Sequence, residues 1–227
     1  MSPRPLRLCL FAAAVAACPR QAGAKDDAQL WLGGTVTVDA GGRVRLSQEV
    51  VARFSANRRG LYEIESNTMV GYRLDSRVTL WAGYTHDPLY AAGRFTLMEQ
   101  RAREQVTVDK LPFGPGTLSL RLRLEQRWRD GTAGTGWRLR PFVRYALPLR
   151  PGGHTALVFS HESFLDLNRT AFQKVGGEER MRNAVALATP LAGRITAEIG
   201  YLNQHGFVPG GPDTSDHVAT VTLSASF

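Results

Sequence analysis

Apolar and polar residues alternate with a period of two along most of the chain after its first two dozen residues. The clearest segment runs from Leu118 to Trp128, where leucine and tryptophan occupy one set of alternate positions and arginine and glutamate the other. A helix with 3.6 residues per turn would scatter these side chains around its whole surface, whereas a strand separates them onto two faces. The pattern therefore predicts a β-strand with one apolar and one charged face.

Comparable segments of about ten residues, separated by turn residues, occur along the rest of the chain. They include residues 44–54, 62–74, 78–84, 137–147, 195–201 and 217–227. Phe142 and Trp81 depart from the pattern because they fall on the charged, inward-facing register. Such segments are typical of transmembrane β-barrels, in which apolar residues face lipid and polar residues face the lumen. We count about eleven segments, and because bacterial barrels have even strand numbers we expect twelve, with ten as the alternative.

Aromatic residues on the apolar faces favour a membrane over a soluble sheet. We place them facing outward near strand ends, at Tyr72, Tyr84, Trp128, Trp137, Tyr145, Tyr201 and Phe227. Rings at both margins of an apolar band are what a membrane interface favours. A periplasmic β-sandwich would also alternate, but it would have little use for charges on one face of so many strands. The fold class predicted is therefore all-β, an antiparallel outer-membrane barrel of a Gram-negative bacterium.

The connections between segments predict which end of the barrel faces the periplasm. Those at 39–42, 74–76, 147–153 and 190–193 are short and are expected on the periplasmic side. Those at 86–93, 168–177 and 203–216 are longer and are expected outside the cell. The chain then ends in the periplasm at Phe227.

The first 24 residues have the organisation of a secretory signal peptide. Arg4 and Arg7 precede an apolar stretch at 8–17, and Ala22-Gly23-Ala24 offers small residues for cleavage. The stretch is too short to cross a bilayer as a helix, which takes about 20 apolar residues. We therefore predict a signal peptide over 1–24 and a barrel over 25–227. The alternative is lipoprotein processing at Cys18, which follows Val15-Ala16-Ala17.

Composition narrows the chemistry available to the mature chain. Both cysteines, Cys9 and Cys18, fall in the presequence, so no disulfide, cysteine metal site or thiol nucleophile is expected after cleavage. The formal charge of +8 falls when Arg4, Arg7 and Arg20 are removed, which leaves 25 basic against 20 acidic residues. The arginines are spread along strands at alternate positions rather than clustered, so we expect no nucleic-acid partner.

The chain resembles an uncharacterised bacterial family, the domain of unknown function twenty-four ninety. The resemblance covers Trp31 to Phe227 and rests on dispersed marks, namely Trp31, Gly71-Tyr72, Gly83-Tyr84, Glu99-Gln100-Arg101, 123–127, Glu162, and Arg180 with Arg182. It implies an outer-membrane barrel and brings no known activity. The terminal Phe227, preceded by alternate apolar residues, looks like the signal that barrel-assembly machinery reads. That machinery and outer-membrane lipid are the partners we predict, for a monomer without a cofactor.

Charged residues on the inward faces form the candidate site. We assign to the lumen Arg121, Arg123, Glu125, Arg127, Arg138, Arg140, Arg144, Glu162, Arg180, Arg182 and Glu198, together with Glu49, Glu63, Glu65, Glu99 and Arg101. In one interpretation they pair across a narrow lumen and fill it, because an ionised group away from water needs a partner. In the other, the surplus of arginine lines a narrow pore that prefers anions. We therefore predict a structural barrel or a narrow pore.

A lipid-modifying enzyme of the lipase or deacylase type is the alternative function. It would need an activated nucleophile, normally a serine oriented beside a histidine and an acid. His161-Glu162-Ser163 is the one tempting cluster, but neighbours on a strand point to opposite faces, so the three cannot converge. His161 and Ser163 are expected outside and Glu162 inside. The five histidines show no metal-ligand spacing. We therefore predict neither catalytic nor metal-binding residues.

Overall fold

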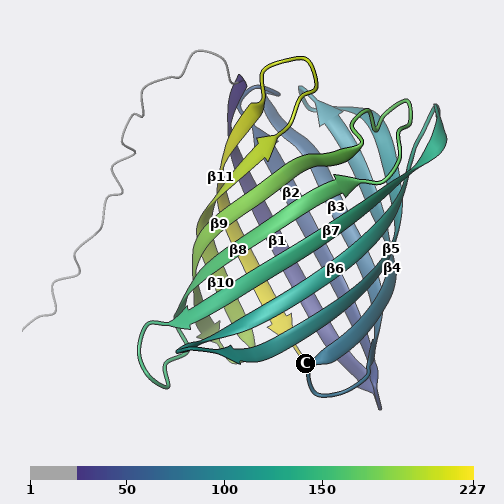
Figure 1. Ribbon diagram of the computed structural model, residues 1–227. Helices are drawn as coiled ribbons and strands as arrows, with labels where there is room; N and C mark the ends of the chain where they lie inside the picture. The colour runs from purple at the N-terminus through teal and green to yellow at the C-terminus, as the bar shows by residue number, and fades with distance from the viewer. Residues whose placement is uncertain (1–24) are drawn as a thin grey trace, which may run out of the picture.

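All strands described between Lys25 and Phe227 belong to one sheet that closes on itself (Figure 1). The computed structural model describes residues 25–227, so the predicted signal peptide and the alternative processing site at Cys18 lie outside the described residues. Along the described part of the chain, no helix has the length and apolar character needed to cross a membrane.

The strands are long and the turns between most of them are short. Their bounds are β1 Lys25–Gly41, β2 Val44–Ser55, β3 Gly60–Arg73, β4 Val78–Ala91, β5 Arg94–Phe113, β6 Gly116–Arg129, β7 Thr132–Pro148, β8 Ala156–Asp166, β9 Gly177–Ala192, β10 Ile195–Gly206 and β11 Thr214–Ser226. Each strand pairs antiparallel with its neighbours in sequence, as in an up-and-down barrel.

The barrel closes through one parallel pair, β1 with β11. Their register runs from Lys25 opposite Thr214 to Thr37 opposite Ser226. The described residues therefore form 11 strands, and the expected twelve, like the alternative of ten, is wrong. An up-and-down barrel with an odd number of strands can close only if its first and last strands run in the same direction. The rule of even numbers presupposes an antiparallel closing pair, which this chain does not have.

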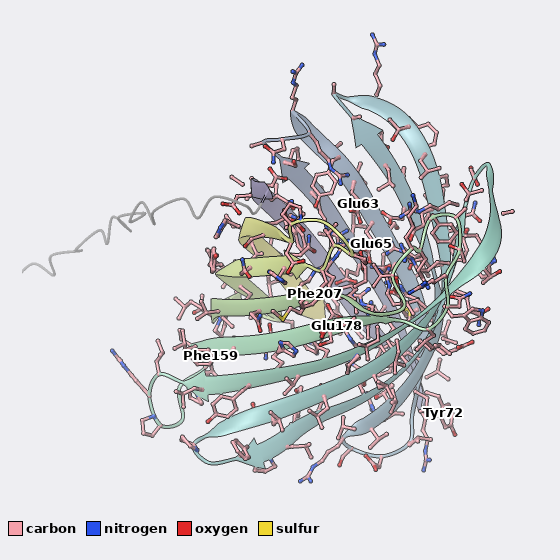
Figure 2. The ribbon with its side chains drawn as sticks, turned by 45° about the horizontal axis from the view of Figure 1, so that its top comes forward. Glu63, Glu65, Tyr72, Phe159, Glu178 and Phe207 are labelled. Carbon is pink, nitrogen blue, oxygen red and sulfur yellow. The ribbon has the colours of Figure 1, made fainter. Side chains whose placement is uncertain are left out.

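The two faces of the strands separate as the alternation predicts. Leu122 and Ile199 are exposed on the outer surface, whereas Arg123 is buried inside. Figure 2, which looks toward the end of the barrel with the longer loops, shows Glu63 and Glu65 in the interior and Tyr72 and Phe159 on the outer surface.

A bulge reverses one predicted side chain. Leu61 pairs with Phe54 and Glu63 with Arg53, so the residue between them, Tyr62, is an extra residue in β3. The alternation over 62–74 predicts that Tyr62 faces outward on the apolar face, together with Ile64. Instead it is buried, and its hydroxyl donates a hydrogen bond to Gln29 Oε1 at 2.8 Å. An extra residue on one strand shifts the alternation locally, and the sequence period alone does not reveal it.

Most of the predicted outward aromatics lie as expected, but two of them are not near strand ends. Tyr84 is in the middle of β4 and Tyr201 in the middle of β10, although both are exposed. The reason for Tyr84 is that β4 continues to Ala91. The predicted long loop at 86–93 is therefore strand, followed by a turn at Ala92 and Gly93.

Successive connections alternate between the two ends of the barrel, and the longest of them, at 167–176, lies at the end opposite Phe227. One end carries the turns at 42–43, 74–77, 114–115, 149–155 and 193–194, and Phe227 lies there with its backbone bonded to Thr37 and Asp39. In the turn at 74–77, backbone N–H groups of Arg77 and Val78 donate to Asp75, which lowers the pKa of its carboxyl. The other end carries the loops at 167–176 and 207–213, together with the short turns at 56–59, 92–93 and 130–131 (Figure 1). The predicted separation of short from long connections therefore holds only in part.

Gly83 of β4 lies opposite Met69 of β3, and β3 leaves no room for a side chain there. A Cβ added there would lie 2.3 Å from the Thr68 carbonyl oxygen and 2.4 Å from Met69 Sδ. Backbone cannot move aside as easily as a flexible side chain, so this position requires glycine.

We expect Gly83→Ala to lower the free energy of unfolding by about 1–3 kcal/mol, because it overpacks a fixed backbone contact. Urea unfolding of the refolded protein in detergent, followed by tryptophan fluorescence, measures the change. Gly34→Ala is the matched control, since nothing lies within 4 Å of a Cβ at Gly34. Equal stability of the two variants would contradict this account.

Candidate functional site

The structure places all the predicted lumen residues on the inward faces of their strands. Those of the middle lumen are largely buried. Arg180, toward the end with the longer loops, and Arg144 and Glu198, nearer the other end, are about one-third exposed. The inward set is Arg121, Arg123, Glu125, Arg127, Arg138, Arg140, Arg144, Glu162, Arg180, Arg182 and Glu198.

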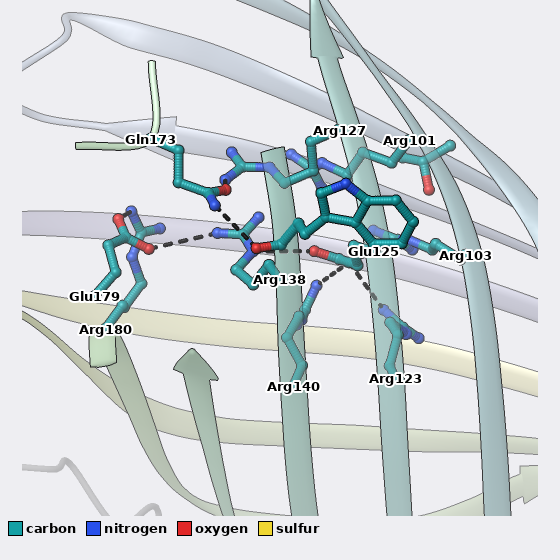
Figure 3. Close-up of polar contacts among 12 residues, drawn as sticks. Arg101, Arg103, Arg123, Glu125, Arg127, Arg138, Arg140, Gln173, Glu179 and Arg180 are labelled. Atoms are coloured by element: carbon teal, nitrogen blue, oxygen red, sulfur yellow. Dashed lines mark hydrogen bonds and ion pairs between the residues drawn. The ribbon is translucent and has the colours of Figure 1, made fainter. Parts of the chain in front are cut away.

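Glu125 of β6 occupies the middle of the lumen and has no exposed surface. It is surrounded by four arginines, with nitrogen–oxygen distances of 2.7 Å to Arg140, 3.1 Å to Arg138, 3.2 Å to Arg103 and 3.9 Å to Arg123 (Figure 3). A carboxylate without water is stable only if it is paired and hydrogen-bonded. The alternation on β5, β6 and β7 brings these partners together because each strand points every second residue inward.

Three more glutamates are shared among arginines in the same way. Glu99 lies within 2.5 to 2.9 Å of Arg101, Arg127 and Arg129. Glu65 contacts Arg53 at 2.8 Å, Arg103 at 2.6 Å and Arg101 at 3.5 Å. Glu162 binds Arg121, Arg140 and Arg182.

Shared arginines join these groups into one chain across the lumen. Arg101 links Glu99 to Glu65, Arg103 links Glu65 to Glu125, and Arg140 links Glu125 to Glu162. We call the four glutamates and their arginine partners the lumen network. Guanidinium groups suit this role because each has five donors in a planar fork and can serve two carboxylates at once.

Two aromatic rings extend the lumen network toward the remaining wall. Phe164 of β8 is 2% exposed, and Arg140 and Arg182 lie 4.3 and 4.6 Å from its ring centre. Trp31 of β1 lies between Arg53 and Arg182, each 4.6 Å from its ring. The negative face of an aromatic ring attracts a cation. These rings therefore stabilise arginines that outnumber the carboxylates.

Arg103 is the central residue that the sequence analysis did not assign to the lumen. It is 1% exposed and bridges two glutamates. The signal was present, since Glu99, Arg101, Arg103 and Gln105 continue one alternation. It was missed because no strand segment was predicted between residues 86 and 117, so the inward register was not followed from Arg101 to Arg103.

A cavity of about 480 Å³ lies between the lumen network and the end with the longer loops. Its walls include Arg58, Arg129, Arg180, Glu179 and Asp216. On the other side of the lumen network, small apolar side chains pack together on the inner wall, namely Ala146, Val158, Ala186 and Ala188. The cavity is therefore open toward the longer loops and closed on the other side by the lumen network. We call this charged cavity the cup and the lumen network its floor.

Three carboxylates in the cup, Glu63, Glu65 and Asp87, have oxygens within 4.8 Å of one another. Such a group resembles a cation site. However, Arg53 binds both glutamates, and Arg101 binds Asp87 and Glu65. Arginine already neutralises these carboxylates, so the donor set does not fit a metal ion.

The sequence His161-Glu162-Ser163 divides between the two faces, as the alternation requires. Glu162 lies inside with Arg140, while His161 and Ser163 share the outer face of β8. His161 Nε2 lies 3.2 Å from Ser163 Oγ, and Nδ1 lies 2.8 Å from Oδ1 of Asn183 on β9. Asn183 was not a predicted site residue, because only the pairing of β8 with β9 brings it beside His161.

Fold and lumen together define a closed β-barrel with a charge-filled interior. The chain belongs to the family described as protein of unknown function (DUF2490), whose model matches residues 28–215. It is also similar to an uncharacterised protein of Methylorubrum extorquens, with 30% identity over 223 residues that cover 97% of each chain. No solved structure matches the chain. The family resemblance predicted from dispersed residues is therefore confirmed.

We expect Glu125→Gln to destabilise the folded barrel by about 3–5 kcal/mol, because it leaves buried arginines without their shared carboxylate. Glu198→Gln is the matched control, since the Glu198–Arg144 pair is about one-third exposed and should contribute about 0–1 kcal/mol. Urea unfolding midpoints in detergent compare the two. A loss no larger for Glu125→Gln than for the control would show that the lumen network does not stabilise the barrel.

Proposed function

We propose that the chain is a bacterial outer-membrane β-barrel whose lumen network closes the interior, so that the barrel is a structural element of the membrane and not an open pore. The observation that carries the proposal is the complete burial of Glu125 and near-complete burial of Arg103 at the middle of the lumen. A water-filled channel would expose these side chains.

The outer surface supports the membrane location. Large apolar side chains are exposed on many strands, among them Val70 at 53%, Ile199 at 61% and Leu122 at 45%. A water-soluble monomer rarely exposes a contiguous apolar surface larger than a few hundred Å². Closure leaves no sheet edge unpaired, which the hydrocarbon region requires of every spanning structure.

The narrow pore remains the alternative for the same barrel. The surplus of arginine over glutamate in the lumen favours it, because charged rings select ions in pores. In that case neutral replacements of Arg123 and Arg127 reduce the preference of the pore for anions.

The proposal also keeps the predicted partners, which are outer-membrane lipid and the barrel-assembly machinery that reads the strand ending at Phe227.

The residues 25–227, refolded in detergent, should migrate differently on a denaturing gel before and after boiling. A closed sheet resists detergent at room temperature because it offers no open edge. Identical migration of both samples, together with solubility in the absence of detergent, would remove the membrane location and favour a periplasmic sandwich.

In planar bilayers the refolded protein should show no steady open level. The double variant Arg103→Ala, Glu125→Ala should conduct, because it removes both charges and much of the side-chain volume at the floor of the cup. Arg144→Ala, Glu198→Ala is the control pair, which removes a similar pair away from the floor. Steady anion-selective current through the unmodified protein, reduced by Arg123→Gln and Arg127→Gln, would instead establish the pore.

A further inference from the structure

Polar side chains cross the outer surface of four neighbouring strands in a single row. His161 of β8 is opposite Asn183 of β9, which is opposite Asn203 of β10, which is opposite His217 of β11. Toward the end that holds Phe227, the outer faces of these strands carry exposed apolar residues such as Phe159, Leu187 and Ile199. Polar groups directed toward lipid are costly unless they are hydrogen-bonded, so their alignment calls for an explanation.

At the β8 end of the row, three side chains form a connected serine–histidine–asparagine set. Ser163 Oγ lies 3.2 Å from His161 Nε2, and His161 Nδ1 lies 2.8 Å from Asn183 Oδ1. His161 and Ser163 are two residues apart on one strand and so share a face. Nucleophile, base and orienting group are thus held within hydrogen-bonding reach on two paired strands rather than on loops.

The hydrogen bonds determine the tautomer of the neutral His161 ring. Asn183 Oδ1 is a carbonyl oxygen and can only accept, so His161 Nδ1 must carry the proton and donate it. In the neutral ring, Nε2 then presents its lone pair to the Ser163 hydroxyl. This is the tautomer in which a histidine can remove a proton from a serine, and the third group maintains it.

A groove of about 450 Å³ on the outer wall leads to the serine. Its walls are mainly valine, leucine and proline side chains of β5, β6 and β7, and His161 and Ser163 lie at its β8 edge. The groove lies where Pro141 interrupts the pairing of β7 with β8, because proline has no backbone N–H to donate to the neighbouring strand. The pairing of β7 with β8 accordingly passes from Leu139 opposite Leu165 to Phe142 opposite Glu162, and omits Ser163. The groove has the apolar character that accommodates a hydrocarbon chain.

We infer that the outer wall at β7–β9 is an active site that hydrolyses long-chain acyl esters of lipids, with Ser163 as nucleophile, His161 as general base and Asn183 as its positioning residue. The acyl chain lies in the groove and its carbonyl carbon faces Ser163 Oγ. The inference rests on the proposed membrane location only for the source of the substrate.

The reaction uses no co-reactant other than water. Ser163 Oγ forms a bond to the ester carbonyl carbon while its proton passes to His161 Nε2. The ester C–O bond then breaks, and the leaving alcohol takes the proton from His161. Water, deprotonated by His161, attacks the acyl-serine in turn, which releases the fatty acid and restores the serine hydroxyl.

Asparagine in place of a carboxylate suits this location. A carboxylate on the outer face would be an ionised group in an apolar surrounding, whereas an amide orients the ring without a charge. Glu162, adjacent in sequence, is unavailable because it points into the lumen and binds Arg140 and Arg121.

A long-chain fluorophosphonate, which reacts with activated serines, tests the site directly on the refolded chain in detergent. We expect one adduct, located at Ser163 by peptide mass spectrometry. Ser163→Ala should abolish it and His161→Ala should slow it at least about 10³-fold. Ser215→Ala and His217→Ala are the matched controls, since both residues also lie on the outer face and should leave labelling unchanged.

The same variants are then assayed for fatty acid released from diacyl phosphatidylethanolamine and from lipid A in mixed micelles, and for hydrolysis of water-soluble p-nitrophenyl butyrate. Release from one lipid and not the other identifies the source of the ester. Asn183→Ala should lower kcat by about 10²-fold, and Asn183→Asp should restore part of it, because both residues accept from Nδ1. A purely structural Asn183 would not discriminate between these two replacements.

Failure of this inference is distinguishable from failure of the proposed function. A heat-modifiable barrel that neither labels at Ser163 nor hydrolyses any of the three esters overturns the active site and leaves the membrane barrel in place. Hydrolysis that persists in Ser163→Ala overturns it as well. Ser163-dependent hydrolysis of p-nitrophenyl butyrate by a protein that shows no heat shift and is soluble without detergent supports the site and removes the membrane location.

Discussion

The parallel pairing of β1 with β11 is the contact on which the rest of the molecule depends. Until those strands meet, the sheet has two open edges and no interior. Once they pair, over the whole register from Lys25 to Thr37, one face of every strand becomes lumen and the other becomes outer wall. The seam joins the two ends of the described chain, so it is also the pairing with the largest loop-closure cost.

Closure creates the electrostatic problem that the lumen network resolves. Inward charges lose access to water, and a carboxylate such as Glu125 then needs several donors at once. Each of the four glutamates in the lumen network is shared among at least three arginines. This satisfies the carboxylates but leaves positive charge in excess. Aromatic faces at Trp31 and Phe164 compensate part of that excess. The interior is therefore held together by many shared contacts, so removal of one member affects its neighbours as well.

The period of two predicted those features that depend on a single strand, namely its position and the two faces of its side chains. The alternation from Leu118 to Trp128 identified both the strand and its two faces, and the inward register of Phe142 and Trp81 was predicted from the same pattern. The guanidinium carbon of the inward Arg121 lies 4.5 Å from the ring centre of Phe142, which confirms the inward position of that ring. The indole N–H of Trp81 donates to Thr107 Oγ1 on the neighbouring strand β5. Such positions depend only on counting residues by twos along one strand.

Features that depend on how distant strands meet could not be predicted in this way. The alternation along a strand does not indicate whether the first and last strands run parallel. The predicted strand number was wrong for this reason. The reversed Tyr62 results from one inserted residue whose effect appears only in the pairing with β2. Asn183 lies beside His161 because of the register between β8 and β9, which no spacing in the sequence reveals.

The odd number of strands among the described residues also separates the two ends of the barrel chain. β1 begins beside the start of β11, at the end with the longer loops, while Phe227 lies at the other end (Figure 1). Groups fused to Lys25 and to Phe227 would therefore stand on opposite sides of whatever layer the barrel crosses. Circular permutation, which usually exploits neighbouring termini, would here need a linker as long as the wall is high.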